Sequence, residues 1–170
     1  MNTVEFLRSK IFYFDNPDHR NDLNRKKSYW NFRGNSIVFT NGCFDILHLG
    51  HVDYLSKAAD LGDVLIVGLN SDESIHRIKG SNRPILDQKS RAMTLASFSF
   101  ITAVIVFEED TPLGLIKIIQ PDVLVKGSDY KSDEIVGADL VLARGGQTQT
   151  IPFVDGYSTT AIENKIRKVK

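Results

Sequence analysis

The sequence is 170 residues long, with 42% hydrophobic and 25% charged residues, a composition typical of soluble globular proteins. This length suffices for one domain with a substantial core and is too short for two ordinary domains. The 21 Lys and Arg balance the 21 Asp and Glu, so no net charge attracts nucleic acid. The longest apolar stretches fall far short of the roughly 20 residues of a membrane span. With a single cysteine, Cys43, and no secretory signal pattern, we expect a reducing, cytoplasmic location.

The first 35 residues differ in composition from the rest of the chain. They hold seven Lys and Arg against four Asp and Glu, a net charge of +3, which leaves −3 for the remainder. Their apolar periodicity is poor, and it predicts only one or two amphipathic turns between Asp18 and Arg33. We therefore predict an N-terminal extension, residues 1–35, packed on a domain that spans residues 36–170.

From Ser36 onward, predicted strands and helices alternate. A β-branched and aromatic run, Ile37 to Thr40, predicts a strand that stops at the turn pair Asn41-Gly42. Apolar residues at helical spacing follow between residues 52 and 61, and the continuous apolar run at 64–67 is typical of a buried parallel strand. The further predicted elements are a helix capped at Ser71-Asp72, a helix at 91–98, a strand at 101–107, a helix at 111–120, a strand at 122–126, a helix at 135–144, a strand at 148–153 and a helix from 158 onward.

This alternation predicts the α/β fold class, as a Rossmann-like three-layer sandwich with a mostly parallel sheet of about five strands. Ligands of such sheets bind beyond the carboxyl ends of the strands. We therefore expect the site in the loops after the first, second and fourth predicted strands and at the start of the last helix.

The loop after the first predicted strand carries a histidine pair in place of the common phosphate-binding motifs. It contains neither Gly-x-Gly-x-x-Gly nor a P-loop. His48 and His51 lie three residues apart at a helix entry, which places both imidazoles on one face beside an anion-attracting helix N-terminus, and Gly50 allows a close approach. Ordinary helix-start residues are one alternative. Zinc ligation with Asp45 is another, but that ligand set is incomplete, so no metal ligands are predicted.

The segment from Gly42 to His51, GCFDILHLGH, resembles the signature of the cytidylyltransferase-like nucleotidyltransferase superfamily, and its His-x-Gly-His core is similar to that of class I aminoacyl-tRNA synthetases. Other segments closely resemble the heptose 1-phosphate adenylyltransferase branch, which makes ADP-heptose for bacterial lipopolysaccharide. These segments are Lys79-Gly80, Arg83-Pro84, FEEDTP at 107–112, LVKGSDY at 124–130 and DGYSTT at 155–160. The resemblance covers roughly residues 36–167.

This resemblance implies an enzyme that joins ATP and a sugar 1-phosphate, namely heptose 1-phosphate, to give ADP-heptose and pyrophosphate, with Mg²⁺ accompanying ATP. Many relatives carry a fused upstream sugar kinase domain, for which this chain is too short. A separate sugar kinase is therefore expected, and relatives suggest a homodimer.

The resemblance also implies roles for individual residues. His48 and His51 would donate hydrogen bonds to the α and β phosphates, and Lys79 and Arg91 would face the phosphates. The alternative for these two cations is an exposed surface charge. Lys126 ends a buried apolar strand, where an unpartnered ammonium is costly, which favours a phosphate or sugar contact. The other expected nucleotide-binding residues are Thr40, Asn41, Gly42, Phe44, Gly50, Gly127, Asp129, Ser158, Thr159 and Thr160, of which the last three also suit helix capping.

Two other functions stay open at this level. Glycerol 3-phosphate cytidylyltransferases share the histidine signature and the Gly-x-Ser-Thr-Thr turn, but they carry an Arg-Thr pair where this chain has Phe153 and Val154. The preference for ATP over CTP comes from the resemblance alone. A non-catalytic nucleotide sensor would keep the pocket without turnover, and the intact His48, His51 and Ser-Thr-Thr turn argue against it.

Overall fold

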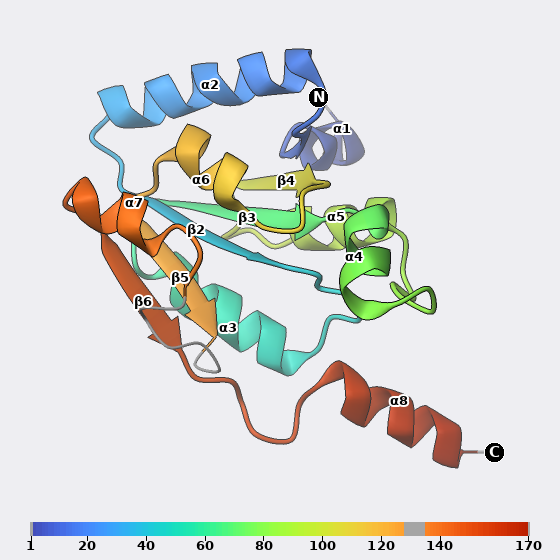
Figure 1. The fold of residues 1–170 in the computed structure, drawn as a ribbon. Coiled ribbons are helices and arrows are strands. Elements are labelled where there is room, and N and C mark those ends of the chain that lie inside the picture. The colour runs from blue at the N-terminus through green and yellow to red at the C-terminus, as the bar shows by residue number, and fades with distance from the viewer. Residues whose placement is uncertain (1, 128–134, 170) are drawn as a thin grey trace.

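A computed structural model describes residues 2–127 and 135–169 of the chain. Its centre is a six-stranded sheet in the order β1-β4-β3-β2-β5-β6, in which every neighbouring pair is parallel (Figure 1). Helices cover both faces of the sheet, so the predicted Rossmann-like three-layer sandwich is confirmed. The strands are β1 Ile11–Tyr13, β2 Ile37–Gly42, β3 Val64–Asn70, β4 Ala103–Phe107, β5 Val123–Gly127 and β6 Gln147–Ile151.

The strand beyond the expected five is β1, which comes from the N-terminal segment. It pairs with β4 at one edge of the sheet, and Ile11 lies opposite Val104. The same segment forms helices α1 (Thr3–Arg8) and α2 (Pro17–Phe32). Helix α2 is much longer than the one or two turns expected. It begins after Asn16, whose side chain accepts bonds from the amides of Asp18 and His19. Its periodicity is weak in the sequence because it buries only Leu23 and Trp30.

The remaining helices follow the predicted order. They are α3 Leu49–Ala59, α4 Asp72–Lys79, α5 Gln88–Ala96, α6 Leu113–Ile119, α7 Ala138–Ala143 and α8 Thr159–Lys168. Ser71 caps α4 as expected, whereas α5 begins three residues earlier than predicted because Asp87 accepts a bond from the amide of Ser90 at 2.7 Å. Across the described part of the chain, no helix combines the length and apolar character that crossing a bilayer requires.

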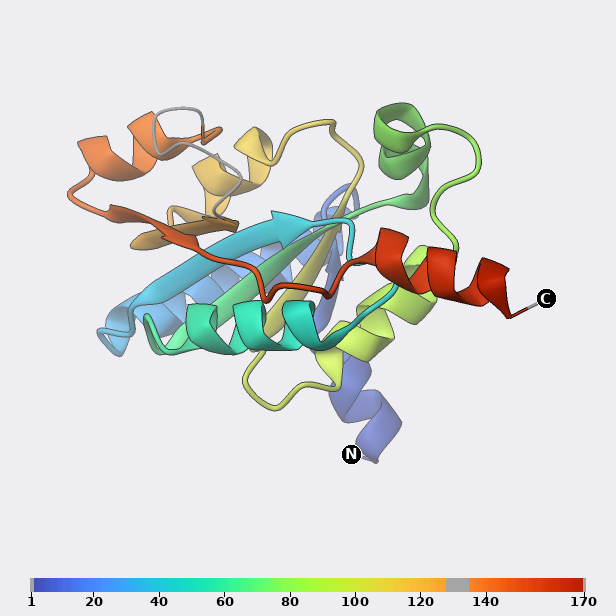
Figure 2. The same cartoon turned by 90° about the horizontal axis from the view of Figure 1, so that it is seen from below.

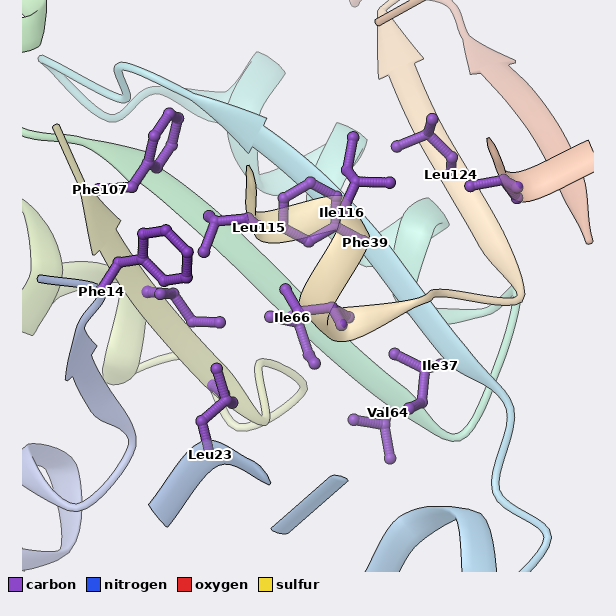
Figure 3. Packing of buried hydrophobic residues seen from close by; sticks show 14 of the residues in the cluster. Phe14, Leu23, Ile37, Phe39, Val64, Ile66, Phe107, Leu115, Ile116 and Leu124 are labelled. Carbon is purple, nitrogen blue, oxygen red and sulfur yellow. The ribbon is translucent and has the colours of Figure 1, made fainter. Parts of the chain in front are cut away.

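Alternating residues of the strands pack into two separate hydrophobic cores, one on each face of the sheet. On one face, Phe39 of β2 and Ile66 of β3 pack toward Ile116 of α6, as Figure 3 shows. On the other face, Val38 of β2 belongs to the cluster that contains Leu55 of α3. Each fully buried side chain of this size contributes roughly 1.5–3 kcal/mol, so the sheet is a firm platform for the loops at its edge.

The strand order places a crevice at a defined edge of the sheet. The chain lays β3 and β4 on one side of β2 and then crosses over to place β5 and β6 on the other side. The connections after β2 and β5 therefore leave in opposite directions, and the space between their carboxyl ends is where ligands bind in open α/β sheets.

Candidate active site at the carboxyl ends of β2 and β5

A cavity of about 500 Å³ lies at the carboxyl ends of β2 and β5. This volume is within the range of about 300–1,000 Å³ that is usual for small-molecule sites. The cavity therefore lies where the sheet topology predicts it. Nine of the residues that the sequence analysis assigned to the site line it: Asn41, Gly42, Phe44, His51, Lys79, Lys126, Gly127, Thr159 and Thr160.

The two signature histidines form a stacked pair. His48 is the N-cap residue of α3 but makes no side-chain capping bond, and its ring lies over that of His51 with centroids 3.9 Å apart and planes 25° apart. The edge of Phe44 supports the His51 ring at a centroid distance of 5.4 Å. The Nδ1 atom of His48 is buried and has no hydrogen-bond partner among the described residues. His51 lines the cavity, whereas His48 is not among the described residues that line it and adjoins the site through its stack on His51.

Burial keeps this histidine pair neutral. It lowers the pKa of His51 to about 4, with further contributions from the nearby His48 and Lys79, and burial also lowers the pKa of His48. A neutral imidazole has one N–H donor and one acceptor. At neutral pH each ring can therefore donate one hydrogen bond to an anion.

Gly50 and Gly42 make room for these rings. A Cβ on Gly50 would lie 3.1 Å from both Cε1 and Nδ1 of His48, and a Cβ on Gly42 would lie 3.1 Å from Cε2 of Phe44. Gly50 does not line the cavity itself. Its place in the motif follows from the close approach of the His48 ring.

Three cationic side chains from different parts of the chain line the cavity. Lys79 ends α4, Arg83 lies in the loop between α4 and α5, and Lys126 belongs to β5. The ammonium of Lys126 donates a hydrogen bond to Oδ1 of Asn41, which links the ends of β5 and β2. A cavity with this lining favours a ligand that carries several negative charges.

Among the described residues that line the cavity, Asp45 is the one that is acidic. Its carboxylate already has partners within the protein. Its Oδ2 accepts a bond from Nη1 of Arg83 at 2.8 Å, and its Oδ1 accepts bonds from the amides of Ile85 and Leu86 at 2.8 and 3.0 Å. Burial acts to raise the pKa of Asp45, but the bonds from Leu86, Arg83 and Ile85 hold it below its ordinary value. Asp45 is therefore an ionised anchor for the loop at 83–86.

Arg91 does not occupy the position expected from the sequence. Its guanidinium is buried and donates to the carbonyls of Leu86, Cys43 and Asn70 at 3.0, 2.6 and 2.9 Å and to Oδ1 of Asp72 at 2.7 Å. It is not among the residues that line the cavity. The expected phosphate contact does not fit, because these donors are already engaged within the protein. Arg91 instead joins the histidine loop to the ends of β3 and α4.

Thr40 and Ser158 also have structural partners. The Thr40 hydroxyl is fully buried and shares a hydrogen bond of 2.6 Å with the hydroxyl of Tyr54. The Ser158 hydroxyl accepts a bond from the amide of Ala161 at 3.0 Å, so it caps α8, while Thr159 and Thr160 line the cavity. Asp129 lies outside the described residues.

Some of the cavity lining was not assigned from the sequence. Tyr54 of α3 and Phe153, which follows β6, form a ring contact with centroids 5.7 Å apart. Cys43 and Asp45 of the motif also line the cavity. Nothing in its local sequence distinguishes Tyr54 from a core tyrosine, and its position depends on the packing of α3 beside the segment after β6.

A family model described as cytidylyltransferase-like matches residues 39–165. The chain belongs to the cytidylyltransferase-like family. The matched region contains every described residue that lines the cavity, from Asn41 to Thr160. Together with the intact histidine signature, this membership makes the chain a nucleotidyltransferase.

Curated proteins from several bacteria are similar to this chain. The bifunctional protein HldE of Nitratiruptor sp. is 59% identical over 135 residues, which are 79% of this chain and 28% of that protein. The protein of the same name from Helicobacter pylori is 56% identical over 132 residues, 78% of this chain and 28% of that protein. This cytidylyltransferase-like chain thus spans little more than a quarter of the length of these relatives.

Two solved structures share the fold. The lipopolysaccharide core biosynthesis protein of Thermoplasma volcanium is 31% identical and aligns with a TM-score of 0.58, covering 74% of this chain and 100% of that chain. The pantoate-beta-alanine ligase of Francisella tularensis is 16% identical with a TM-score of 0.56, covering 93% of this chain and 78% of that chain. The second likeness concerns the fold alone.

Proposed function

We propose that this chain joins ATP to a sugar 1-phosphate, with heptose 1-phosphate as the substrate, and releases an ADP-sugar and pyrophosphate. The observation that carries the proposal is the neutral, stacked pair of His48 and His51 beside a cavity lined by Lys79, Arg83 and Lys126. The likeness to the HldE proteins and to the lipopolysaccharide core biosynthesis protein supports the choice of a heptose.

The proposed reaction needs no residue that removes a proton. An oxygen of the sugar phosphate attacks the α-phosphorus of ATP and forms a new P–O bond. The bond from the α-phosphorus to the oxygen that bridges it to the β-phosphorus breaks, and that oxygen leaves with its electron pair as part of pyrophosphate. A phosphate monoester has its second pKa near 6 and is mostly dianionic at neutral pH, so the nucleophile is already deprotonated.

The protein's task is therefore to align two anions and to stabilise the charge that develops on the α-phosphate and the pyrophosphate. His48 and His51 donate N–H groups to the phosphates, and the ammonium groups of Lys79 and Lys126 neutralise part of the remaining charge. Arg83 is already paired with Asp45 and Glu163. Thr159 and Thr160 place the N-terminus of α8 at the same cavity. Unsatisfied amides and the helix dipole at such a terminus favour bound phosphate.

Mg²⁺ is proposed to accompany ATP. It would neutralise charge on the triphosphate and on the departing pyrophosphate. Mg²⁺ prefers oxygen ligands and retains several waters, and both oxygens of Asp45 already accept bonds within the protein. The phosphates and water would therefore hold the ion, and we assign no residue of this chain as its ligand.

The aromatic contact at the cavity bears on the choice between ATP and CTP. Phe153 stands where the CTP-dependent glycerol 3-phosphate branch carries an arginine, and its ring contacts Tyr54. The cavity thus presents an aromatic surface where that branch presents a cation. We therefore favour ATP over CTP.

The test is a pyrophosphate-release assay on the purified chain with Mg²⁺. Parallel reactions combine ATP or CTP with heptose 1-phosphate, with other sugar 1-phosphates and with glycerol 3-phosphate. We expect rapid release for ATP with heptose 1-phosphate and little without the sugar. Faster release with CTP and glycerol 3-phosphate would contradict the proposal, and tight ATP binding without turnover would indicate a sensor.

A further inference from the structure

Helix α8 contributes to the cavity although it is weakly attached to the rest of the fold. None of its residues, Thr159–Lys168, is buried. Figure 2 shows that it lies outside the three layers, beyond the carboxyl ends of the strands, and that a segment without helix or strand joins it to β6. Its first two residues nevertheless line the cavity. Because no residue of the helix is fully buried, polar contacts are important for the position of these threonines.

An ion-pair chain links α8 to the histidine motif. Arg83 donates through Nη1 to Oδ2 of Asp45 at 2.8 Å, and its Nη2 forms an ion pair with Oε1 of Glu163 in α8. The three side chains are mostly shielded from water, with exposed fractions of 22% for Arg83, 7% for Asp45 and 18% for Glu163. Such shielding makes an ion pair less sensitive to screening than one on an open surface.

The Asp45 end of this series of ion pairs is itself held in place. Asp45 lies within the GCFDILHLGH motif, and it also accepts the amides of Ile85 and Leu86. The guanidinium of Arg83 is therefore held by an anchored carboxylate on one side and presents its other nitrogen to α8. This arrangement gives Glu163 a docking point whose position is set by the motif loop.

The spacing within α8 connects this docking point to the cavity. Glu163 lies four residues after Thr159 and three after Thr160, and residues at these spacings share one face of a helix. Holding Glu163 against Arg83 therefore turns the threonine end of that face toward the cavity. Lys165, on the same helix, is exposed and forms no ion pair within the described part of the chain.

We propose that Glu163 is a positioning residue, which holds α8 through Arg83 and Asp45 so that Thr159 and Thr160 face the phosphates of the bound nucleoside triphosphate. The inference rests on the proposed function for the identity of that nucleotide. The attachment of α8 itself is independent of which nucleotide binds.

The central test compares Glu163→Gln, which removes the charge at nearly constant shape, with Lys165→Gln as a control on the same helix. We expect Glu163→Gln to raise the KM for ATP about fivefold, the size of effect of one partly shielded ion pair, with kcat changed less than about twofold. The KM for the sugar 1-phosphate stays unchanged in both variants. Lys165→Gln leaves all three parameters as in the wild type.

Hydrogen exchange of the free protein gives a second readout that needs no ligand. The amides of α8 should exchange faster in Glu163→Gln than in the wild type and in Lys165→Gln, while those of α3 and α5 keep their rates. A wild-type exchange rate for α8 in Glu163→Gln would overturn the proposal, and so would a wild-type KM for ATP.

A double-mutant cycle identifies the route through Arg83. If Glu163 acts through this residue, Arg83→Gln combined with Glu163→Gln raises the KM for ATP no further than Arg83→Gln alone. Additive effects would overturn this route. Absence of wild-type turnover with ATP and heptose 1-phosphate would contradict the proposed function, while the exchange comparison still decides the role of Glu163.

Discussion

The rings of His48 and His51 stack with their centroids 3.9 Å apart and their planes 25° apart. Two imidazolium cations at this separation would repel each other in a partly buried site. Burial and this proximity lower the pKa of His51 to about 4. The pair is therefore neutral at neutral pH, and in the proposed reaction it acts as two neutral donors toward the negatively charged substrates.

Replacing either histidine should impair catalysis more than folding. We expect His48→Ala and His51→Ala each to lower kcat by about 10² or more, as the loss of a donor to a charged transition state does. Steady-state pyrophosphate release measures the effect. The control is His76→Ala, which changes an exposed histidine on α4. An unchanged rate in His51→Ala would remove the pair from the mechanism.

The pKa of His51 predicts that the protein loses stability in acid. The pKa is about 4 in the folded chain against 6.5 ordinarily, so between these values the unfolded chain binds more protons. This histidine therefore lowers the free energy of unfolding as pH falls through that window and has no such effect above it. Urea unfolding at about pH 7.5 and about pH 5 measures the change.

The matched control for this pH dependence is His51→Gln, which cannot gain a proton. Other groups titrate in both proteins, so the difference between them isolates His51. We expect the wild type to lose more stability on acidification than His51→Gln does. Parallel losses would show that His51 is not buried as a neutral ring.

Gly50→Ala should disturb the histidine pair without unfolding the protein. The new Cβ would lie 3.1 Å from two atoms of the His48 ring and 3.4 Å from Cβ of Tyr157, while alanine itself favours the helix. We expect kcat/KM to fall about tenfold or more because a small misplacement of a catalytic group is costly. Thermal unfolding and pyrophosphate release on the same preparation separate the two effects.

Gly114→Ala provides the comparison for this variant. Gly114 lies in α6, and the atoms nearest to its added Cβ would be Oε1 at the end of the Glu109 side chain at 3.2 Å and ring atoms of Phe14 at 3.5 and 3.7 Å. We expect its activity to equal that of the wild type. Equal activities of Gly50→Ala and Gly114→Ala would contradict a steric role for Gly50.

Lys10→Met should weaken the attachment of the N-terminal segment. The Lys10 ammonium is buried and donates to the carbonyls of Ala96 and Phe98 at 2.8 and 2.9 Å, where α5 ends. Methionine removes both bonds, although the carbonyl of Phe98 keeps its bond from the amide of Ile101 at 3.3 Å. The loss should lower the free energy of unfolding by about 1–3 kcal/mol. Denaturant unfolding measures the loss, and Lys117→Met on exposed α6 surface is the control. A loss no greater than that of the control would contradict the role.

The parts of the fold that local patterns specify were predictable. Continuous apolar runs marked β2 to β5, and capping residues such as Ser71 marked helix starts. Strand β1 was not predicted, because a three-residue edge strand has no pattern of its own and is recognised only by its pairing with β4. Helix α2 was underestimated since few of its residues are buried.

The chemical identity of the site followed from residues that are close in the chain. His48 is the N-cap residue of α3, and Gly50 and His51 lie in its first turn, so residues that are close in the chain bring the two rings together. The family signature is local for the same reason. Which cations join them is a different question, because it depends on loops that are distant in the chain.

Two arginines show the difference between what the sequence determines and what the tertiary structure decides. Arg83 and Arg91 are eight residues apart and equally charged, yet Arg83 lines the cavity while Arg91 is buried among carbonyls. The sequence by itself determined the βαβ order, the histidine motif and the class of chemistry. Only the tertiary structure decided which charges face the ligand, because an arginine is directed by its nearest acceptors. Those acceptors lie 38 residues away at Asp45 and 48 residues away at Cys43, and only the folded sheet brings them near.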